Sequence, residues 1–263
     1  MVSELPWDSK TGTLRRDLAE GMMNPACSHA LEAALQIKEK HGGHITVFTM
    51  GPPMAEEVLF EAVALGADQG ALLTDPKMAG ADTFITSYIL SRAIKKICPD
   101  FDLILCGCYT SDSETAQVGP QLAEELSIPG VAYVEHLDIQ DRTVRIQRLT
   151  DNFLETLEMD LPGLITITTQ QYAPRYAPLS GLQDAFERNK IIRLTAKKLG
   201  LDSEMSGLKN SPTQIVDVYS PIMDKKNIIL KGTAKKIVGQ IFEKFDDKIG
   251  GAIGKDLKVG KES

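Results

Sequence analysis

Apolar residues in the first half of the chain follow two alternating patterns. Three segments carry apolar side chains at helical spacing and are predicted to be helices: 27–40, 55–65 and 83–97. Three short runs rich in β-branched and other apolar residues are predicted to be strands: 45–49, 71–73 and 103–106. This alternation predicts an α/β fold with a doubly wound, mostly parallel, Rossmann-like sheet that is covered by helices on both faces.

Three loops follow the predicted strands at their carboxyl ends. They are Met50–Pro53, Thr74–Thr83 and Gly107–Gln117. In open sheets of this class, ligands bind in a crevice outside the carboxyl ends of the strands. We therefore expect the three loops to converge on one crevice.

The third loop has the composition of a phosphate cradle. Gly107 and Gly119 allow close approach of the backbone, and Ser111, Ser113 and Thr115 add hydroxyl groups ahead of a helix. Free backbone N–H groups and the positive end of the helix dipole attract anions at such a position. An ordinary strand–helix turn with a capped helix has the same spacing, so the residues alone leave both interpretations open.

The second half of the chain changes character. Alternating residues on both sides of a turn predict an antiparallel hairpin, and a further strand and a short charged helix follow: 143–149, 154–158, 164–169 and 183–189. Residues 198–226 lack a regular spacing of apolar residues, and residues 232–245 are predicted to form a basic amphipathic helix. We expect an α/β domain over 1–197 and, over 198–263, a C-terminal arm and helix that contact a partner subunit.

Composition and charge exclude several classes of protein. The net charge of −7 argues against a nucleic-acid-binding surface. No apolar run approaches the length of a membrane span, and the start of the chain lacks the pattern of a signal peptide. We expect a cytoplasmic protein that has no membrane span and binds no nucleic acid.

The cysteines and histidines do not form a recognisable reactive group. Four cysteines in 263 residues do not suggest a disulfide framework, and Cys106 and Cys108 have no second Cys or His pair at zinc spacing. The four histidines are scattered along the chain, and the sequence shows no recognisable Ser/His/Asp catalytic triad. The sequence therefore predicts neither a metal site nor a catalytic acid or base.

Six short motifs occur in a fixed order along the chain. They are Met23-Asn24-Pro25, Met50-Gly51-Pro52-Pro53, Gly80-Ala81-Asp82-Thr83 with Thr86-Ser87, Asp112 with Thr115-Ala116-Gln117-Val118-Gly119-Pro120, Glu155-Thr156-Leu157 with Leu161-Pro162, and Pro174-Arg175-Tyr176-Ala177. With these motifs in register, the chain from about residue 11 onward resembles the beta subunit of an electron transfer flavoprotein. The family usually has acidic or glycine residues where this chain has Asn152 and Phe153.

The resemblance implies an adenine nucleotide in the crevice. Conventional members of the family hold AMP there, whereas electron-bifurcating members hold a second FAD. The amino-acid sequences of segments 115–120 and 81–83 resemble those of the bifurcating subgroup. By this resemblance, ten residues are expected to surround the nucleotide: Asn24, Cys27, Met50, Gly51, Gly107, Asp112, Thr115, Ala116, Gln117 and Val118. Thr83 and Thr86 are expected near the pyrophosphate or the flavin.

The same resemblance implies a role in electron transfer. NADH is the expected electron donor, ferredoxin or flavodoxin one acceptor, and an FAD bound mainly by the alpha subunit the other. Residues 174–191 match the family's recognition loop, which docks a flavin-dependent dehydrogenase. Leu179 aligns with the anchoring leucine of that loop, and Arg175 and Tyr176 are expected beside it.

Relative to the family, a short apolar first strand is missing ahead of Met1. Either the start of the sequence was assigned too late, or the sheet tolerates the gap. Because loss of a central parallel strand would expose two edges, we expect the first of these. Two other functions remain open at this point: a conventional carrier with structural AMP and no reaction with NADH, and a stand-alone nucleotide-binding or nucleotide-hydrolysing protein. The residues do not identify the partner dehydrogenase or its substrate.

Overall fold

The computed structural model describes residues 7–8, 13–14, 21–111, 113–151, 153–202, 205, 207–214 and 228–256. The chain divides into two compact units, Met1–Val218 and Tyr219–Ser263.

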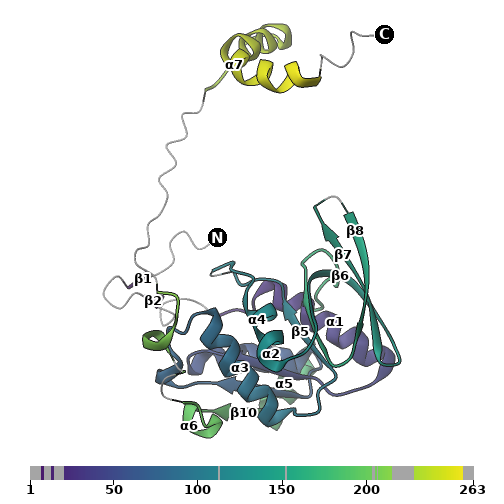
Figure 1. Cartoon of the computed structure of the whole chain (residues 1–263), viewed down its shortest axis with the longest axis vertical. Helices are drawn as coiled ribbons and strands as arrows, with labels where there is room; N and C mark the ends of the chain where they lie inside the picture. Colours follow the sequence, from purple (N-terminus) through teal and green to yellow (C-terminus); the bar gives the residue numbers. More distant parts are fainter. Residues whose placement is uncertain are drawn as a thin grey trace. The chain divides into compact units, whose positions relative to one another are not determined.

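Helices and strands alternate through the first half of the larger unit (Figure 1). Its helices are α1 (Pro25–His41), α2 (Glu57–Leu65), α3 (Thr83–Ile97), α4 (Val118–Leu126), α5 (Leu179–Arg188) and α6 (Ala196–Leu199), with short 3-10 turns at Pro53–Glu56, Pro76–Met78 and Leu208–Asn210. Its strands are β1 (Trp7–Asp8), β2 (Thr13–Leu14), β3 (Thr46–Met50), β4 (Gln69–Leu73), β5 (Leu103–Gly107), β6 (Gly130–Gln140), β7 (Thr143–Thr150), β8 (Phe153–Asp160), β9 (Gly163–Ile167) and β10 (Ile191–Leu194).

The main strands form two sheets. One is parallel, with strand order β10-β4-β3, and the other is mixed, with strand order β5-β9-β6-β7-β8. In the mixed sheet β5 and β6 run parallel to β9, whereas β7 runs antiparallel to both β6 and β8. The predicted hairpin is confirmed as β7 and β8. The short β1 and β2 pair with each other.

The sequence predicts one sheet in this region, and the described strands form two. In the described part of the chain, β3 pairs only with β4, and β5 pairs only with β9. Burial follows this division: Gly70–Leu73 of β4 are buried, whereas β3 and β5 are partly exposed along their whole length. A strand with neighbours on both sides loses its accessible surface, and an edge strand keeps part of it.

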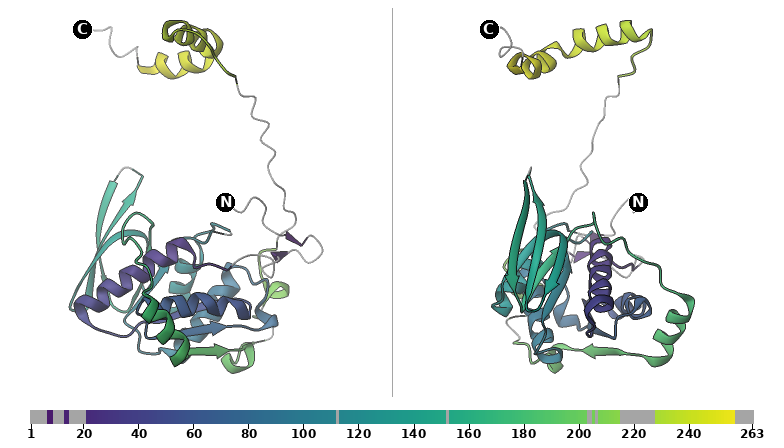
Figure 2. Two further views of the ribbon diagram at one scale, coloured as in Figure 1. Left: turned by 180° about the vertical axis from the view of Figure 1, so that it is seen from behind. Right: turned by 90° about the vertical axis from the view of Figure 1, so that its right-hand side faces the viewer.

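Helices cover both faces of the mixed sheet, as the sequence predicts (Figure 2). Ala30 and Ala33 of α1 pack against Ile165 and Ile167 on one face. On the other face Leu122 of α4 packs with neighbouring side chains of α3 and β9. α1 and α4 therefore approach the carboxyl ends of β5 and β9 from opposite sides.

The local sequence sets the start and the buried face of α3. Asp82 caps the helix because its carboxylate accepts a hydrogen bond of 3.0 Å from the backbone N–H of Ile85. Ile85, Ile89 and Ala93 recur at helical spacing and are buried. Lys96 lies in the last turn, where a cation stabilises the helix dipole. The result is a helix over 83–97, as the sequence predicts.

Part of the predicted arm packs on the larger unit. The hydroxyl of Ser211 accepts a hydrogen bond from the backbone N–H of Asp82, and the Asp82 carboxylate accepts one from the backbone N–H of Thr213. Residues 207–214 therefore lie against the start of α3, whereas 215–227 of the expected arm lie outside the described residues.

The smaller unit contains α7 (Ala234–Asp256), which extends beyond the predicted helix 232–245. Its backbone leaves helical geometry at Phe245, so that the helix is kinked there. Val238 and Phe242 are exposed. Among the described residues, no helix combines the length and the apolar character that a membrane span requires.

Candidate nucleotide-binding site

Asn24, at the start of α1, holds the loop that follows β5. Its side-chain amide donates hydrogen bonds to the backbone carbonyl of Tyr109 (2.8 Å) and to the Cys27 sulfur (3.3 Å), and its side-chain oxygen accepts one from the backbone N–H of Ser111 (3.0 Å). The structure therefore brings together two segments that are more than eighty residues apart in sequence.

A second set of hydrogen bonds joins α3 to α4. The Thr83 hydroxyl donates to the side-chain oxygen of Gln117 at 2.9 Å. The buried Ser87 hydroxyl lies 2.8 Å from the Thr83 carbonyl and 3.1 Å from the Val118 carbonyl. At the end of β3, the backbone N–H of Gly51 donates to the Leu73 carbonyl at the end of β4. The loops that follow β4 and β5 therefore meet at one edge, and the place of the loop after β3 at that edge stays a prediction.

Two helices begin at this edge without a side-chain cap. Asn24 precedes α1 and Gln117 precedes α4, but neither side chain caps its own helix, since each is engaged elsewhere. The first turns of α1 and α4 also contain no acidic residue. The N–H groups of a first turn have no partner within the helix and carry partial positive charge. An anion can bind to them without competing with a protein carboxylate.

Gly107 allows α1 to approach β5 closely. A Cβ atom at this position would lie 2.6 Å from the backbone carbonyl carbon of Ala26 and 2.6 Å from the backbone nitrogen of Cys27. These distances are shorter than van der Waals contact, and backbone atoms cannot turn aside as a flexible side chain can. Glycine is therefore required where the end of β5 meets the first turn of α1.

Two buried oxygen atoms near this edge have no hydrogen-bond partner among the described residues. They are Oε1 of Gln121, in the first turn of α4, and Oγ1 of Thr168, just after β9. Buried polar groups without a protein partner commonly bind water or a ligand. Sequence reasoning missed both residues, because neither belongs to a motif that indicates a ligand.

Tyr133 also lies beside this region and was not predicted. It sits where the register of β6 shifts, has a φ of 60°, and donates its backbone N–H to the Thr166 hydroxyl. A bulky residue in this backbone region is uncommon, and β-bulges are frequent near functional sites. Only the structure shows this conformation, since β6 has no glycine or other local signal there.

The remaining predicted site residues lie in these same elements. Cys27 is in the first turn of α1, Met50 ends β3, and Thr86 is in the first turn of α3. Thr115 is exposed, and Ala116 has a φ of 56° in the loop before α4. Asp112 lies outside the described residues.

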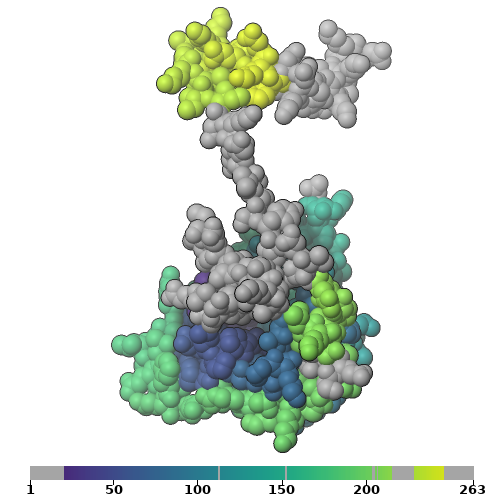
Figure 3. All heavy atoms as spheres, turned by 90° about the vertical axis from the view of Figure 1, so that its left-hand side faces the viewer, coloured from purple at the N-terminus to yellow at the C-terminus, as the bar shows by residue number. Residues whose placement is uncertain are grey.

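The residues predicted to dock a partner differ in their surroundings. Tyr176 and Leu179 are 97% and 83% exposed, in the segment around α5 that runs along the surface (Figure 3). Arg175 instead points inward at α1, where its guanidinium binds Glu32 and Glu39. Phe186 of α5 stacks on Phe60 of α2 with ring centroids 4.4 Å apart.

Two cavities in the described part of the chain flank α1 and do not lie at the strand ends. One is lined by residues of α1 and α2 and by Pro174 and Arg175, and the other by residues of α1 and β6 and by Tyr172. No group of three His, Cys, Asp or Glu residues among the described ones could hold a metal ion. The candidate nucleotide site rests instead on the uncapped starts of α1 and α4 at the edge formed by the loops.

Comparison with known proteins identifies the family of this chain. Residues 11–199 match the model of the electron transfer flavoprotein domain. The chain belongs to the electron transfer flavoprotein family. It is 39% identical over 247 residues to the electron transfer flavoprotein subunit beta of Thermoanaerobacterium thermosaccharolyticum, an alignment that covers 94% of each chain.

Other relatives have related names. The chain is 39% identical over 249 residues to the caffeyl-CoA reductase–Etf complex subunit CarD of Acetobacterium woodii, with 94% of each chain covered. It is 37% identical over 238 residues to protein FixA of Sinorhizobium fredii, with 88% of this chain and 83% of the relative covered. The expected resemblance to electron transfer flavoprotein beta subunits is thus confirmed. Membership implies that the chain binds a flavin or AMP and has an alpha subunit as partner.

The thiol of Cys106 is shielded in this electron transfer flavoprotein subunit. Burial raises its pKa to about 12, and a neighbouring Cys27 contributes in the same direction. The Cys106 thiol is therefore protonated at pH 8, and the thiol is much less nucleophilic than the thiolate. We expect iodoacetamide to label Cys106 at least about tenfold more slowly in the folded protein than in urea. Peptide mass spectrometry measures both rates, and Cys98, which like Cys106 is partly exposed, serves as internal control for accessibility. Equal rates at Cys106 in both states would contradict the raised pKa of its thiol.

Asn24→Ala removes the hydrogen bonds that fix the loop after β5. We expect ADP to bind about tenfold more weakly, because two polar contacts that position the loop backbone are lost. Isothermal titration calorimetry of the heterodimer after removal of its nucleotide measures the affinity. Gln36→Ala is the control, because Gln36 lies farther along α1 and its side chain donates to Glu32, so that this variant should bind ADP normally. Unchanged ADP affinity in Asn24→Ala would remove Asn24 from the site.

Proposed function

We propose that this chain is the beta subunit of an electron-bifurcating electron transfer flavoprotein and that it binds FAD at the edge formed by the three loops. When bound, FAD would accept a hydride from NADH and supply one electron to ferredoxin or flavodoxin and one to the FAD of the alpha subunit. The second electron would continue to a flavin-dependent dehydrogenase. The relatives named for CoA reductase complexes support this proposal.

One observation carries the nucleotide part of the proposal. The first turns of α1 and α4 meet at the same edge, lack side-chain caps, and have no acidic residue. Their N–H groups provide partners for the diphosphate of a dinucleotide, and no lysine or arginine occurs between residues 107 and 118 to take that role. The buried oxygens of Gln121 and Thr168 are further groups that a ligand or water can satisfy.

The residues of the chain would then bind and orient rather than transfer protons. Asn24 would fix the loop at residues 109–111, and the pair of Thr83 and Gln117 would fix the entry to α4. Cys27, Met50, Gly51, Thr86, Thr115, Ala116 and Val118 would line the same edge. The flavin carries the redox chemistry, so that the lack of a catalytic acid or base in the sequence agrees with this function.

The cofactor content of the native heterodimer tests this proposal. The beta subunit is produced with its alpha subunit, the nucleotides are released with acid, and FAD and AMP are quantified by chromatography. Two FAD per heterodimer would support bifurcation, whereas one FAD with one AMP would favour the conventional carrier. A flavin-free monomer would favour the stand-alone nucleotide-binding protein. Ferredoxin reduction by NADH, dependent on an added dehydrogenase and its acceptor, then tests bifurcation itself.

The second unit and the loop around α5 would contact partners. Val238 and Phe242 are exposed on the basic helix α7, as expected of a helix that packs against the alpha subunit. Tyr176 and Leu179 would meet the flavin-dependent dehydrogenase, because large exposed apolar side chains on a loop are common at binding hot spots.

A further inference from the structure

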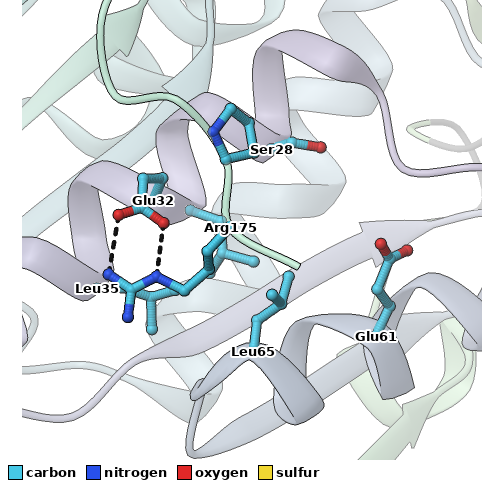
Figure 4. A pocket seen from close by; sticks show the side chains of 8 residues that line it. Ser28, Glu32, Leu35, Glu61, Leu65 and Arg175 are labelled. Atoms are coloured by element: carbon cyan, nitrogen blue, oxygen red, sulfur yellow. Dashed lines mark hydrogen bonds and ion pairs between the residues drawn. The ribbon is translucent and has the colours of Figure 1, made fainter. Parts of the chain in front are cut away.

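The guanidinium of Arg175 is held by two carboxylates of α1. Its Nε and Nη2 donate to the two oxygens of Glu32 at 2.8 Å each, a bidentate arrangement (Figure 4). Nη1 donates to Glu39 at 2.5 Å. The Glu32 side chain is only 5% exposed, whereas that of Glu39 is 59% exposed. Gln36 donates a further hydrogen bond to Glu32 at 2.9 Å. Glu32 is thus a buried carboxylate whose charge is matched by a residue of the loop.

This contact fixes one end of the segment that carries the exposed apolar residues. Arg175 directly precedes Tyr176 and lies four residues before Leu179. The other end is fixed on α2: a Cβ atom at Gly181 would lie 2.4 Å from the Ala64 carbonyl oxygen, and Phe186 stacks on Phe60. Between these two attachments, Tyr176 and Leu179 project into solvent. An exposed anchor that is held in place loses less conformational freedom when it binds a partner.

We propose that Glu32 is a positioning residue for partner docking: through its bidentate contact with Arg175 it holds Tyr176 and Leu179 in the orientation that the partner binds. This inference rests on the proposed docking function of the loop. Arg175 then has a different role from Tyr176 and Leu179: its guanidinium binds α1, whereas their side chains would contact the partner. Glu39 assists from the exposed side and contributes less, because water screens it.

Arginine fork contacts of this kind are sensitive to loss of charge. Arg175 hydrogen bonding holds the pKa of the Glu32 carboxyl below its usual range, so that the carboxylate is charged at neutral pH. Glu32→Gln keeps the size of the side chain but replaces one acceptor oxygen by a donor NH2 group, which cannot accept from a guanidinium. The fork then loses one of its two bonds and its charge attraction, and the loop is released at that end.

The rate of trypsin cleavage after Arg175 reports whether its guanidinium is bound to α1. The enzyme cuts the bond between Arg175 and Tyr176 only after the guanidinium has left α1 and entered the protease pocket. In the alpha–beta heterodimer, we expect Glu32→Gln to raise the cleavage rate at this bond about tenfold and Glu39→Gln to raise it less than about threefold. Mass spectrometry of the peptides separates this bond from the other cleavage sites.

The docking role is measured with a purified acyl-CoA dehydrogenase, reduced by its acyl-CoA, as the electron donor. We expect Glu32→Gln to raise the KM for the heterodimer several-fold while kcat and nucleotide content stay unchanged, a separation that general misfolding would not produce. An unchanged cleavage rate overturns the proposal. Faster cleavage with an unchanged KM also overturns it, if Leu179→Ala raises KM. If Leu179→Ala leaves KM unchanged as well, the docking function of the loop fails and the inference with it.

Discussion

Replacing Gly107 by alanine is expected to lower nucleotide affinity at least about tenfold and to destabilise the protein by about 1–3 kcal/mol. The added Cβ would lie 2.6 Å from backbone atoms of Ala26 and Cys27, so that either β5 or the first turn of α1 must shift. Asn24 immediately precedes that turn and holds the loop at Tyr109 and Ser111. A shift of α1 therefore disturbs both walls of the candidate site at once.

Thermal unfolding and ADP titration of the same preparation measure the two effects. Gly21→Ala is the matched control, because Gly21 precedes the same helix and a Cβ there would meet no atom within 4 Å. We expect its stability to stay within about 0.5 kcal/mol of the parent and its ADP affinity to be unchanged. Full ADP affinity in Gly107→Ala would show that the nucleotide does not bind between α1 and β5.

The sequence predicts the elements around this site well where local signals agree. The helix 83–97 has an aspartate cap and a regular spacing of isoleucines, and its bounds are confirmed. The helix predicted over 183–189 begins earlier, at Leu179. Glycine is unfavourable inside a helix, but Gly181 allows α5 to pack on the backbone of Ala64. Tertiary packing thus overrides a local propensity.

Other features depend on partners that are distant in sequence. The division into two sheets depends on whether β3 and β5 pair, and no local pattern encodes that pairing. Asn24 is a candidate from its motif, but its bonds to residues 109–111 are visible only after folding. Arg175 belongs to a loop motif, and its contact with Glu32 spans 143 residues. The sequence identifies these residues without showing which groups they bind.

Leu179→Ala is expected to impair docking without affecting stability. Its side chain is 83% exposed, so that truncation removes little buried surface and the melting temperature should stay unchanged. If Leu179 fills a pocket on the dehydrogenase, its loss costs at least about 2 kcal/mol of binding, which corresponds to about a thirtyfold rise in the KM for the heterodimer. The rate at saturating heterodimer should change little, because the residue does not contact the proposed nucleotide site.

Leu154→Ala provides the comparison, since Leu154 is also a leucine with a largely exposed side chain (62%) but lies on the β7–β8 hairpin, outside the loop around α5. Electron transfer from the acyl-CoA dehydrogenase to both variants is measured over a range of heterodimer concentrations. A KM that rises only for Leu179→Ala assigns docking to the loop rather than to exposed apolar surface in general. Equal KM values for the two variants and the parent would mean that the partner binds elsewhere on the heterodimer. The attachments of the loop at Arg175 and at Gly181 would then contribute only to the stability of the fold.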